Sequence, residues 1–383
     1  MLQANAVNQD RMVKTFMDLV LIDSPSGQEE AIGRELSKRL RDLGCEVHQD
    51  KAGNLVAELP GEGKEAILLS THMDTVGTDT GIKPILRDGV VYSDGTTILG
   101  ADDKSGIAIV LEILQQLREH PEWRHPPLEI VMTVSEEQGL RGSRQMDLSR
   151  LRATWGVVLD TTGPIGTFTY AAPFSRYFTF TINGRAAHAG VEPEKGVSAI
   201  RVAAEAIAEM PLGRLDEETV ANVGTVEGGV ARNIVADRAV LKAMTRSHDD
   251  DKLEAQTATM VKSLEAAAAR NGATLEVEVE DVYKGYTISP DQRPYREVAR
   301  AAERLGLPGK PKKSGGGTDA NLFNHAGVQC VPVSTGMAAE HTKDEHIAIA
   351  DMVDAARLVL ALVVRDESAG PEPAPVAGSK GGS

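Results

Sequence analysis

The chain has 383 residues, of which 41% are hydrophobic and 25% charged, and its formal net charge is −15. This balance is typical of a globular protein with a full core. A general phosphate-binding surface needs the opposite charge, and aromatic residues, at 4%, are too sparse for base-stacking platforms. We therefore expect no nucleic-acid partner.

The sequence also carries no sign of secretion or membrane insertion. Its amino-terminal amphipathic stretch is interrupted by Arg11, Lys14 and Asp18, which does not fit a signal peptide. No apolar run approaches the roughly 20 residues that cross a bilayer. The only cysteines, Cys45 and Cys330, lie far apart, and their sparsity fits a reducing compartment. We expect a cytoplasmic protein with no membrane partner.

The first part of the chain alternates apolar runs with a helical pattern. Residues 64–70, 128–135 and 154–160 have the character of buried strands. Between the first two, residues 104–120 place one apolar face on a helix, at positions 107, 110, 111, 114 and 117. This β–α–β rhythm predicts an α/β fold with a mostly parallel sheet.

A different order of elements follows the third strand. A strand with alternating apolar side chains is followed by a helix, two strands, a long helix and a final strand, which is the ferredoxin-like order β–α–β–β–α–β. The α/β pattern then resumes with a helix at 291–305. We expect an inserted domain at 174–286 between two parts of one domain, 1–173 and 287–368. A disordered tail, 369–383, is rich in proline, glycine, alanine and serine.

All three buried runs end in histidine or acidic residues. The side chains at these ends are His72, Asp74, Glu136, Glu137 and Asp160. Ligands of open α/β sheets bind at the carboxyl ends of the strands, so these groups should meet at one edge. Asp102 and Asp103 precede the long helix, and His341 follows a later apolar strand. Singly, each group has a structural alternative, such as an aspartate that caps a helix; together they predict a metal cluster.

The chain resembles the peptidase T family in five metal-site motifs: STHMDTV, GADDKSG, SEEQG, the LD of VVLD, and EHTKDE. That family belongs to the two-zinc amidohydrolases, with carboxypeptidase G and succinyl-diaminopimelate desuccinylase. The likeness covers nearly the whole chain apart from the tail. It implies a zinc-exopeptidase-like catalytic domain interrupted by a ferredoxin-like lid that also forms a homodimer. The implied activity is release of the N-terminal residue from short peptides of tripeptide size.

The resemblance also implies a role for each metal ligand. His72 and Asp160 would hold one zinc ion, Glu137 and His341 would hold the other, and Asp102 would bridge the two. Two zinc ions carry four positive charges, which three carboxylates and one bridging hydroxide neutralise. This balance favours a pKa of about 7 for the bound water. Cobalt or manganese suits the same ligands.

Catalytic positions follow from the same likeness. Asp74 would hydrogen-bond the ring nitrogen of His72 that faces away from the metal, and Glu136 would act as general base. Neighbours at a strand end point to opposite sides unless the chain turns, so Glu137 can bind metal while Glu136 reaches the water. The peptide bond between Asp102 and Asp103 is expected to be cis.

Four substrate-side residues are also implied by the resemblance. His188, in GRAAHAG, would reach the active site of the partner subunit and stabilise the oxyanion. Arg246, in MTRSH, would bind a substrate carboxylate through its planar guanidinium group. Asn233, in ARNIVAD, would contact the substrate, and Gly316, in KKSGGGTDAN, would admit the substrate backbone. The structural alternatives are a buried lid histidine for His188, a surface salt bridge for Arg246 and a turn residue for Asn233.

Two other functions remain open from the sequence. The first is a related amidohydrolase, either a carboxypeptidase or an N-acyl amino acid deacylase, because specificity pockets leave little trace in sequence. The second is a metal-dependent binding protein without turnover. The presence of Glu136 argues against that reading, since such a protein has no need of a general base. The residue that recognises the peptide amino group is not evident from the sequence.

Overall fold

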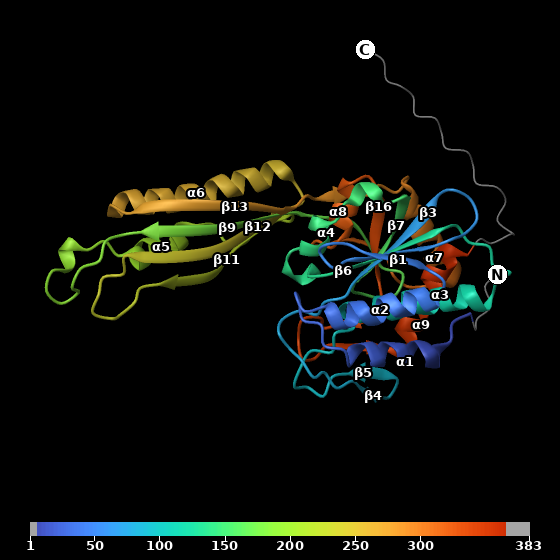
Figure 1. Ribbon diagram of the computed structural model, residues 1–383. Helices are drawn as coiled ribbons and strands as arrows, with labels where there is room; N and C mark the ends of the chain where they lie inside the picture. The colour runs from blue at the N-terminus through green and yellow to red at the C-terminus, as the bar shows by residue number, and fades with distance from the viewer. Residues whose placement is uncertain (1–5, 365–383) are drawn as a thin grey trace, which may run out of the picture.

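Two bodies make up the computed structural model, which describes residues 6–364 (Figure 1). The larger body is built on a nine-stranded, mainly parallel sheet, and the smaller one extends from it as a five-stranded antiparallel sheet with two helices. The predicted fold class, an α/β sheet interrupted by a ferredoxin-like unit, is confirmed. The predicted tail at 369–383 lies outside the described residues.

The central sheet has the order β1-β2-β6-β3-β7-β16-β8-β14, with β15 beside β8. Its middle strands β6, β3, β7 and β16 are parallel, and β3 is buried at every residue. The bounds are β1 Glu46–Gln49, β2 Leu55–Leu59, β3 Ala66–His72, β6 Leu128–Thr133, β7 Ala153–Thr161, β8 Phe168–Ala172, β14 Tyr286–Thr287, β15 Pro311–Lys313 and β16 Gln329–Ser334.

Both faces of the central sheet are covered. Ile67 and Leu69 of β3 pack into the main core with α1, α2, α3, α7 and α9, whereas Leu68 packs on the opposite face with Phe323 of α8. Because side chains on both faces of β3 are covered, its residues from Ala66 to Leu69 are all apolar. The helices are α1 Gln9–Val20, α2 Glu30–Asp42, α3 Ala101–Glu119, α4 Arg141–Gln145, α7 Arg293–Leu305, α8 Ala320–His325 and α9 Ile349–Val363. None of the helices in the described part of the chain is long and apolar enough to cross a membrane.

A small third sheet, with the order β17-β18-β5-β4, lies beside the main one and was not predicted. Its strands are two or three residues long, too short for a readable period. They are β4 Ile85–Arg87, β5 Val90–Tyr92, β17 Met337–Ala338 and β18 His346–Ala348. The loop between β17 and β18 contains His341.

The smaller body, called the lid below, consists of β9 to β13 with α5 and α6. Its sheet has the order β10-β11-β12-β9-β13. Phe178, Phe180 and Ile182 of β9 pack under the two helices, in agreement with their predicted alternation. The bounds are β9 Phe174–Asn183, α5 Ala199–Glu209, β10 Gly213–Arg214, β11 Thr219–Gly228, β12 Arg238–Ser247, α6 Asp250–Asn271 and β13 Thr274–Tyr283, and the short 3₁₀ turns of the chain are η1 Glu136–Gln138, η2 Leu148–Arg150 and η3 Pro193–Lys195.

Candidate metal centre

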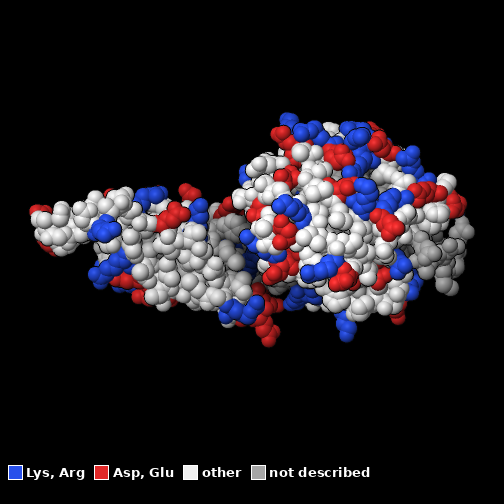
Figure 2. Space-filling model, turned by 90° about the horizontal axis from the view of Figure 1, so that it is seen from below, with Lys and Arg blue, Asp and Glu red and all other residues white. Residues whose placement is uncertain are grey.

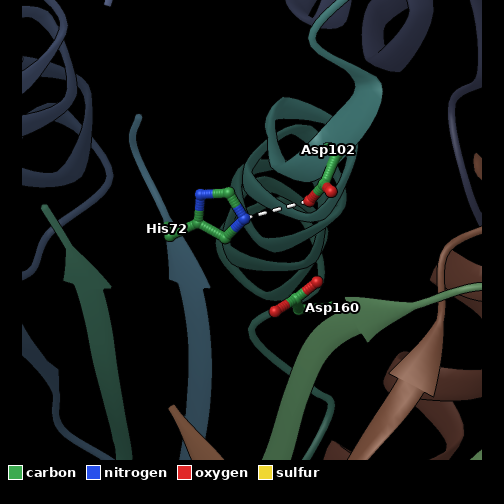
Figure 3. A group of neighbouring side chains, drawn as sticks. All are labelled: His72, Asp102 and Asp160. Carbon is green, nitrogen blue, oxygen red and sulfur yellow. Dashed lines mark hydrogen bonds and ion pairs between the residues drawn. The ribbon is translucent and has the colours of Figure 1, made fainter. Parts of the chain in front are cut away.

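The predicted metal ligands meet at the carboxyl edge of the central sheet. His72 ends β3, Asp160 lies near the end of β7, and Asp102 stands at the start of α3; Figure 3 shows these three side chains around one common space. Glu137 lies in η1, after β6, and His341 lies in the β17–β18 loop. Five residues from five separate segments are thus brought together.

Asp102 lies between two histidines. Its Oδ1 atom is 3.0 Å from Nε2 of His72, and its Oδ2 atom is 3.2 Å from Nε2 of His341. Glu137 Oε1 is 3.0 Å from the same His341 nitrogen. Two groups of donor atoms therefore share Asp102, one completed by His72 and Asp160 and the other by Glu137 and His341, and within each group the atoms lie within 4.8 Å of one another. Imidazole and carboxylate are catalytic zinc ligands, and one carboxylate can bridge two metal ions. These residues fit a two-metal centre.

The cluster is rich in buried negative charge. Burial raises the pKa of Glu136 well above its ordinary value, raises that of Glu137, and raises that of Asp160 to about 8. Hydrogen bonds to Asp102 and Glu137 raise the pKa of His341 to about 10. Within residues 6–364, no lysine or arginine forms an ion pair with these carboxylates. Protons or metal cations must therefore balance the charge.

Asp74 joins the histidine to the turn that follows β6. Its Oδ1 atom accepts the backbone N–H of Glu136 at 3.0 Å, and Oδ2 accepts the backbone N–H of Glu137 at 3.2 Å and the Ser26 hydroxyl at 2.7 Å. Nδ1 of His72 lies 3.4 Å from the Asp74 carboxylate and 3.0 Å from the Asp74 backbone carbonyl. The carboxylate thus lies within ion-pair distance of His72, but its hydrogen bonds go to Ser26 and to the turn after β6.

Glu136 and Glu137 face the same space. Ser135 adopts a left-handed conformation, with φ at 50°, and the chain enters η1 directly after it. Ligand atoms of both glutamates and of His72 lie within 4.8 Å of one another. The expectation of opposite directions assumed an extended chain, whereas β6 ends at Thr133 and the chain turns.

Asp102 and Asp103 have different surroundings. The peptide bond between them is cis, as the resemblance implies. The buried carboxylate of Asp103 accepts the backbone N–H groups of His72 and Gly106, each at 3.2 Å, so it holds the start of α3 against β3. Only Asp102 is among the candidate ligands.

A cavity of about 370 Å³ opens over the cluster and is lined by both bodies. Two of the four predicted substrate residues line it, Arg246 at the end of β12 and Gly316. Arg246 donates from Nη1 to the carbonyl of Gly315 at 3.3 Å, and its buried Nε has no partner among the described residues. A larger cavity of about 610 Å³, beside α1, contains none of the cluster residues.

His188 and Asn233 do not line the cavity over the cluster. They lie in the loops after β9 and β11, where the Ala189 N–H donates to the Asn233 carbonyl at 3.0 Å. Ser175, at the start of β9, pairs with Arg246, and the strand runs on to Asn183. Eight residues of strand span roughly 25 Å. The two predicted residues are therefore at the far end of the lid.

Several cavity residues were not predicted. Lys312 lines the cavity and donates from Nζ to the Thr162 carbonyl at 2.8 Å. Tyr283 accepts the N–H of Gly317 at 3.0 Å, and a side chain at that glycine would collide with the tyrosine ring. The pairing of β13 with β9 shifts register between Asp281 and Tyr283. Such an irregularity leaves no mark in the alternation pattern, although the glycine run that contains Gly316 pointed to the neighbouring segment.

Known proteins match nearly the whole length of the chain. The profile "Peptidase family M20/M25/M40" matches residues 68–365. The Bacillus subtilis protein YqjE is 41% identical over 366 residues, which cover 93% of this chain and 98% of that protein. Peptidase T of Brevibacillus brevis is 26% identical and covers 93% of each chain.

Two solved structures agree closely with this fold. The crystal structure of aminopeptidase PepT from Bacillus cereus has a TM-score of 0.84 at 41% identity and covers 94% of this chain and 99% of that one. A Staphylococcus aureus tripeptidase has a TM-score of 0.88 at 38% identity, with coverages of 94% and 98%. These matches confirm the resemblance to peptidase T and the prediction of a metal-dependent exopeptidase. The chain belongs to peptidase family M20/M25/M40.

Proposed function

We propose that the chain is a two-zinc aminopeptidase that removes the N-terminal residue from peptides of tripeptide size. The main support is the buried carboxylate of Asp102, whose two oxygens face two different histidines. The names of the solved relatives, an aminopeptidase PepT and a tripeptidase, support the substrate class. The two free, buried cysteines support a cytoplasmic location.

In this proposal the five metal ligands form two sets that share Asp102. His72 and Asp160 would hold one ion, Glu137 and His341 the other, and Asp102 both. A pair of divalent cations, when bound, supplies Lewis-acid polarisation of the scissile carbonyl and activation of water.

Glu136 is the proposed general base. Its carboxylate accepts a proton from the water that attacks the carbonyl carbon, and then delivers that proton to the leaving nitrogen as the C–N bond breaks. The Asp74 carboxylate, which accepts the backbone N–H of Glu136, would hold the base in place.

Two cationic side chains at the cavity would select short substrates. Arg246, with its unpartnered Nε, and Lys312 are placed to receive the free carboxylate of a short peptide. A cavity of about 370 Å³ is at the small end of ligand pockets, which is consistent with a substrate of a few residues.

A homodimer would complete the site. We propose that residues 174–286 act as a lid and pairing domain whose far end carries His188 and Asn233 to the active site of a second subunit, where the histidine stabilises the oxyanion. Within the described part of the chain, β10 pairs only with Val220 and Ala221 of β11, so residues 222–228 form an open strand edge there. Figure 2 shows a stretch of lid surface almost without charged side chains. Val226, which is 47% exposed, adds apolar surface on the edge strand.

Metal analysis paired with a substrate panel tests the activity. The purified protein should contain up to two zinc ions per chain, lose hydrolysis on chelation and regain it with zinc. Tripeptides should be cleaved at the N-terminal residue, whereas N-acetylated amino acids should not. Preference for the acetylated compounds would instead support a deacylase, and metal binding without hydrolysis would support a binding protein.

Glu136→Gln separates chemistry from metal binding. It should keep the metal content and lower kcat by about 10²–10⁴-fold. Mixing this variant with His188→Ala, each inactive alone, should restore activity in mixed dimers, because one of the two sites then has both residues. Failure of the mixture to gain activity would contradict the shared site.

A further inference from the structure

Glu345 is a buried carboxylate whose hydrogen bonds go to the segment that carries Asp102. It lies in the β17–β18 loop and is only 1% exposed. Its Oε2 atom accepts the N–H groups of Leu99 at 2.8 Å and Gly100 at 2.7 Å, and its Oε1 atom accepts the N–H of Asp102 at 2.9 Å. One side chain thus binds three backbone donors from a segment more than 240 residues away.

The segment from Leu99 to Asp102 cannot satisfy these donors by itself. N–H groups at the start of a helix have no partner within that helix. Gly100 precedes α3 in a left-handed conformation, with φ at 75°, and as a glycine it has no side chain to act as a cap. Asp102 is also non-helical, with ψ at 106°. Without Glu345, three N–H groups would lose their acceptor in the protein interior, which is unfavourable.

The same loop also supplies a candidate metal ligand. His341 precedes Glu345 by four residues, and the loop is closed by bonds of its own. The Glu345 N–H donates to the Thr342 carbonyl at 3.2 Å, and the Thr342 hydroxyl donates to the Ala339 carbonyl at 2.7 Å. One short loop therefore carries His341 and, through Glu345, also binds the backbone N–H of Asp102. The Asp102 carboxylate lies between His341 and His72.

The buried ammonium of Lys104 attracts the charge of Glu345 through space, but the two groups do not form an ion pair. Among the described residues, no lysine, arginine or histidine forms an ion pair with it. The buried ammonium of Lys104, in the same part of the fold, donates to the Ile22 carbonyl at 2.8 Å. The backbone N–H groups of the Leu99–Asp102 segment are the partners that the carboxylate has.

We propose that Glu345 is the positioning residue of the metal centre: it fixes the backbone of Asp102 so that one carboxylate meets two histidines. This inference rests on the two-metal function proposed above and adds a residue that acts through Asp102, without contact to metal or substrate. Its removal weakens metal binding, because the shared ligand no longer has a fixed place. Changes to the residues that support a metal ligand typically weaken metal affinity 10–100-fold.

The test compares Glu345→Gln with a matched control, Glu129→Gln. Glu129 is also buried, at 2% exposed, and also accepts backbone N–H groups, those of Arg152 and Ala153. The hydrogen bonds of Glu129 lie at the start of β6, whereas η1, which contains Glu137, follows the end of that strand. Both glutamines replace a buried acceptor of backbone N–H groups, so a general loss of stability appears in both variants.

Metal-free protein is titrated with cobalt(II), and binding is followed by visible absorption and by competition with a chelator. Glu345→Gln should bind cobalt about 10–100-fold more weakly than the wild type, and Glu129→Gln within about twofold of it. The melting temperature of the metal-free protein should be lowered in both variants. Cobalt affinity in Glu345→Gln equal to that of the wild type would overturn the positioning role. A wild type that binds no second cobalt ion would instead refute the two-metal function itself.

A second measurement needs no variant. Coupling between two sites is reciprocal, so if Glu345 aids metal binding, bound metal must tighten the bonds of Glu345. Hydrogen exchange of the Leu99, Gly100 and Asp102 amides in the wild type should therefore slow when cobalt is added, relative to the Arg152 and Ala153 amides held by Glu129. Equal protection with and without cobalt would overturn the inference even if Glu345→Gln does not fold.

Discussion

Replacing Asp74 by asparagine probes the support beneath the general base. The Asp74 carboxylate accepts three hydrogen bonds, from the Ser26 hydroxyl and from the backbone N–H groups of Glu136 and Glu137. An asparagine keeps the shape of the side chain but has only one acceptor oxygen. Whichever way the amide lies, its NH₂ group faces at least one buried N–H.

The magnitude follows from these contacts. A buried donor without an acceptor is unfavourable by about 1–3 kcal/mol, and the remaining bonds lose the added strength of a charged acceptor. We expect Asp74→Asn to lower the free energy of unfolding of the metal-free protein by about 2–4 kcal/mol. Release of the Glu136 N–H also moves the proposed base, so kcat should fall by about 10–100-fold at saturating metal.

Urea unfolding of metal-free protein and steady-state kinetics on a tripeptide measure the two effects. Ser26→Ala is the control, because it removes one hydroxyl donor and leaves the carboxylate to both N–H groups. It should lower the free energy of unfolding by only about 0.5–1.5 kcal/mol and largely retain kcat. An Asp74→Asn protein with the stability and kcat of the wild type would refute the reasoning.

Three further predictions concern the cavity and the cluster. Arg246→Met should raise KM about 10–100-fold for tripeptides with a free carboxylate but little for the corresponding amides, and equal effects on both would exclude a carboxylate contact. Metal uptake should release protons, because His341, whose pKa is raised to about 10, and Asp160, whose pKa is raised to about 8, are protonated at pH 7 without metal and must deprotonate to bind it. Affinity should therefore rise between pH 6 and 9, and calorimetry in buffers of different ionisation enthalpy would reveal proton release, or contradict the prediction by its absence. Gly317→Ala should lower stability by about 1–3 kcal/mol through its clash with Tyr283, which a thermal melt measures; an unchanged melting temperature would show that the loop can move.

The sequence by itself determined the fold class and the edge of the sheet at which the polar groups gather. Buried strands are continuous apolar runs, so the point where a run stops is visible, and the residues found there were His72, Glu136 and Asp160. Parallel strands bring such ends to one edge whatever the details of packing. The order of elements likewise predicted the ferredoxin-like insertion, because alternation and helical periods are local properties of the chain.

Tertiary structure alone decided how the side chains meet. The turn after Ser135, which points Glu136 and Glu137 into one space, depends on bonds to Asp74, far away in the sequence. The hydrogen bonds of Glu345 to the Asp102 segment and the position of Tyr283 after a register shift also depend on partners that are distant in the sequence. These are choices among distant partners, made by packing and by the need to satisfy buried donors, and periodicity carries no record of them.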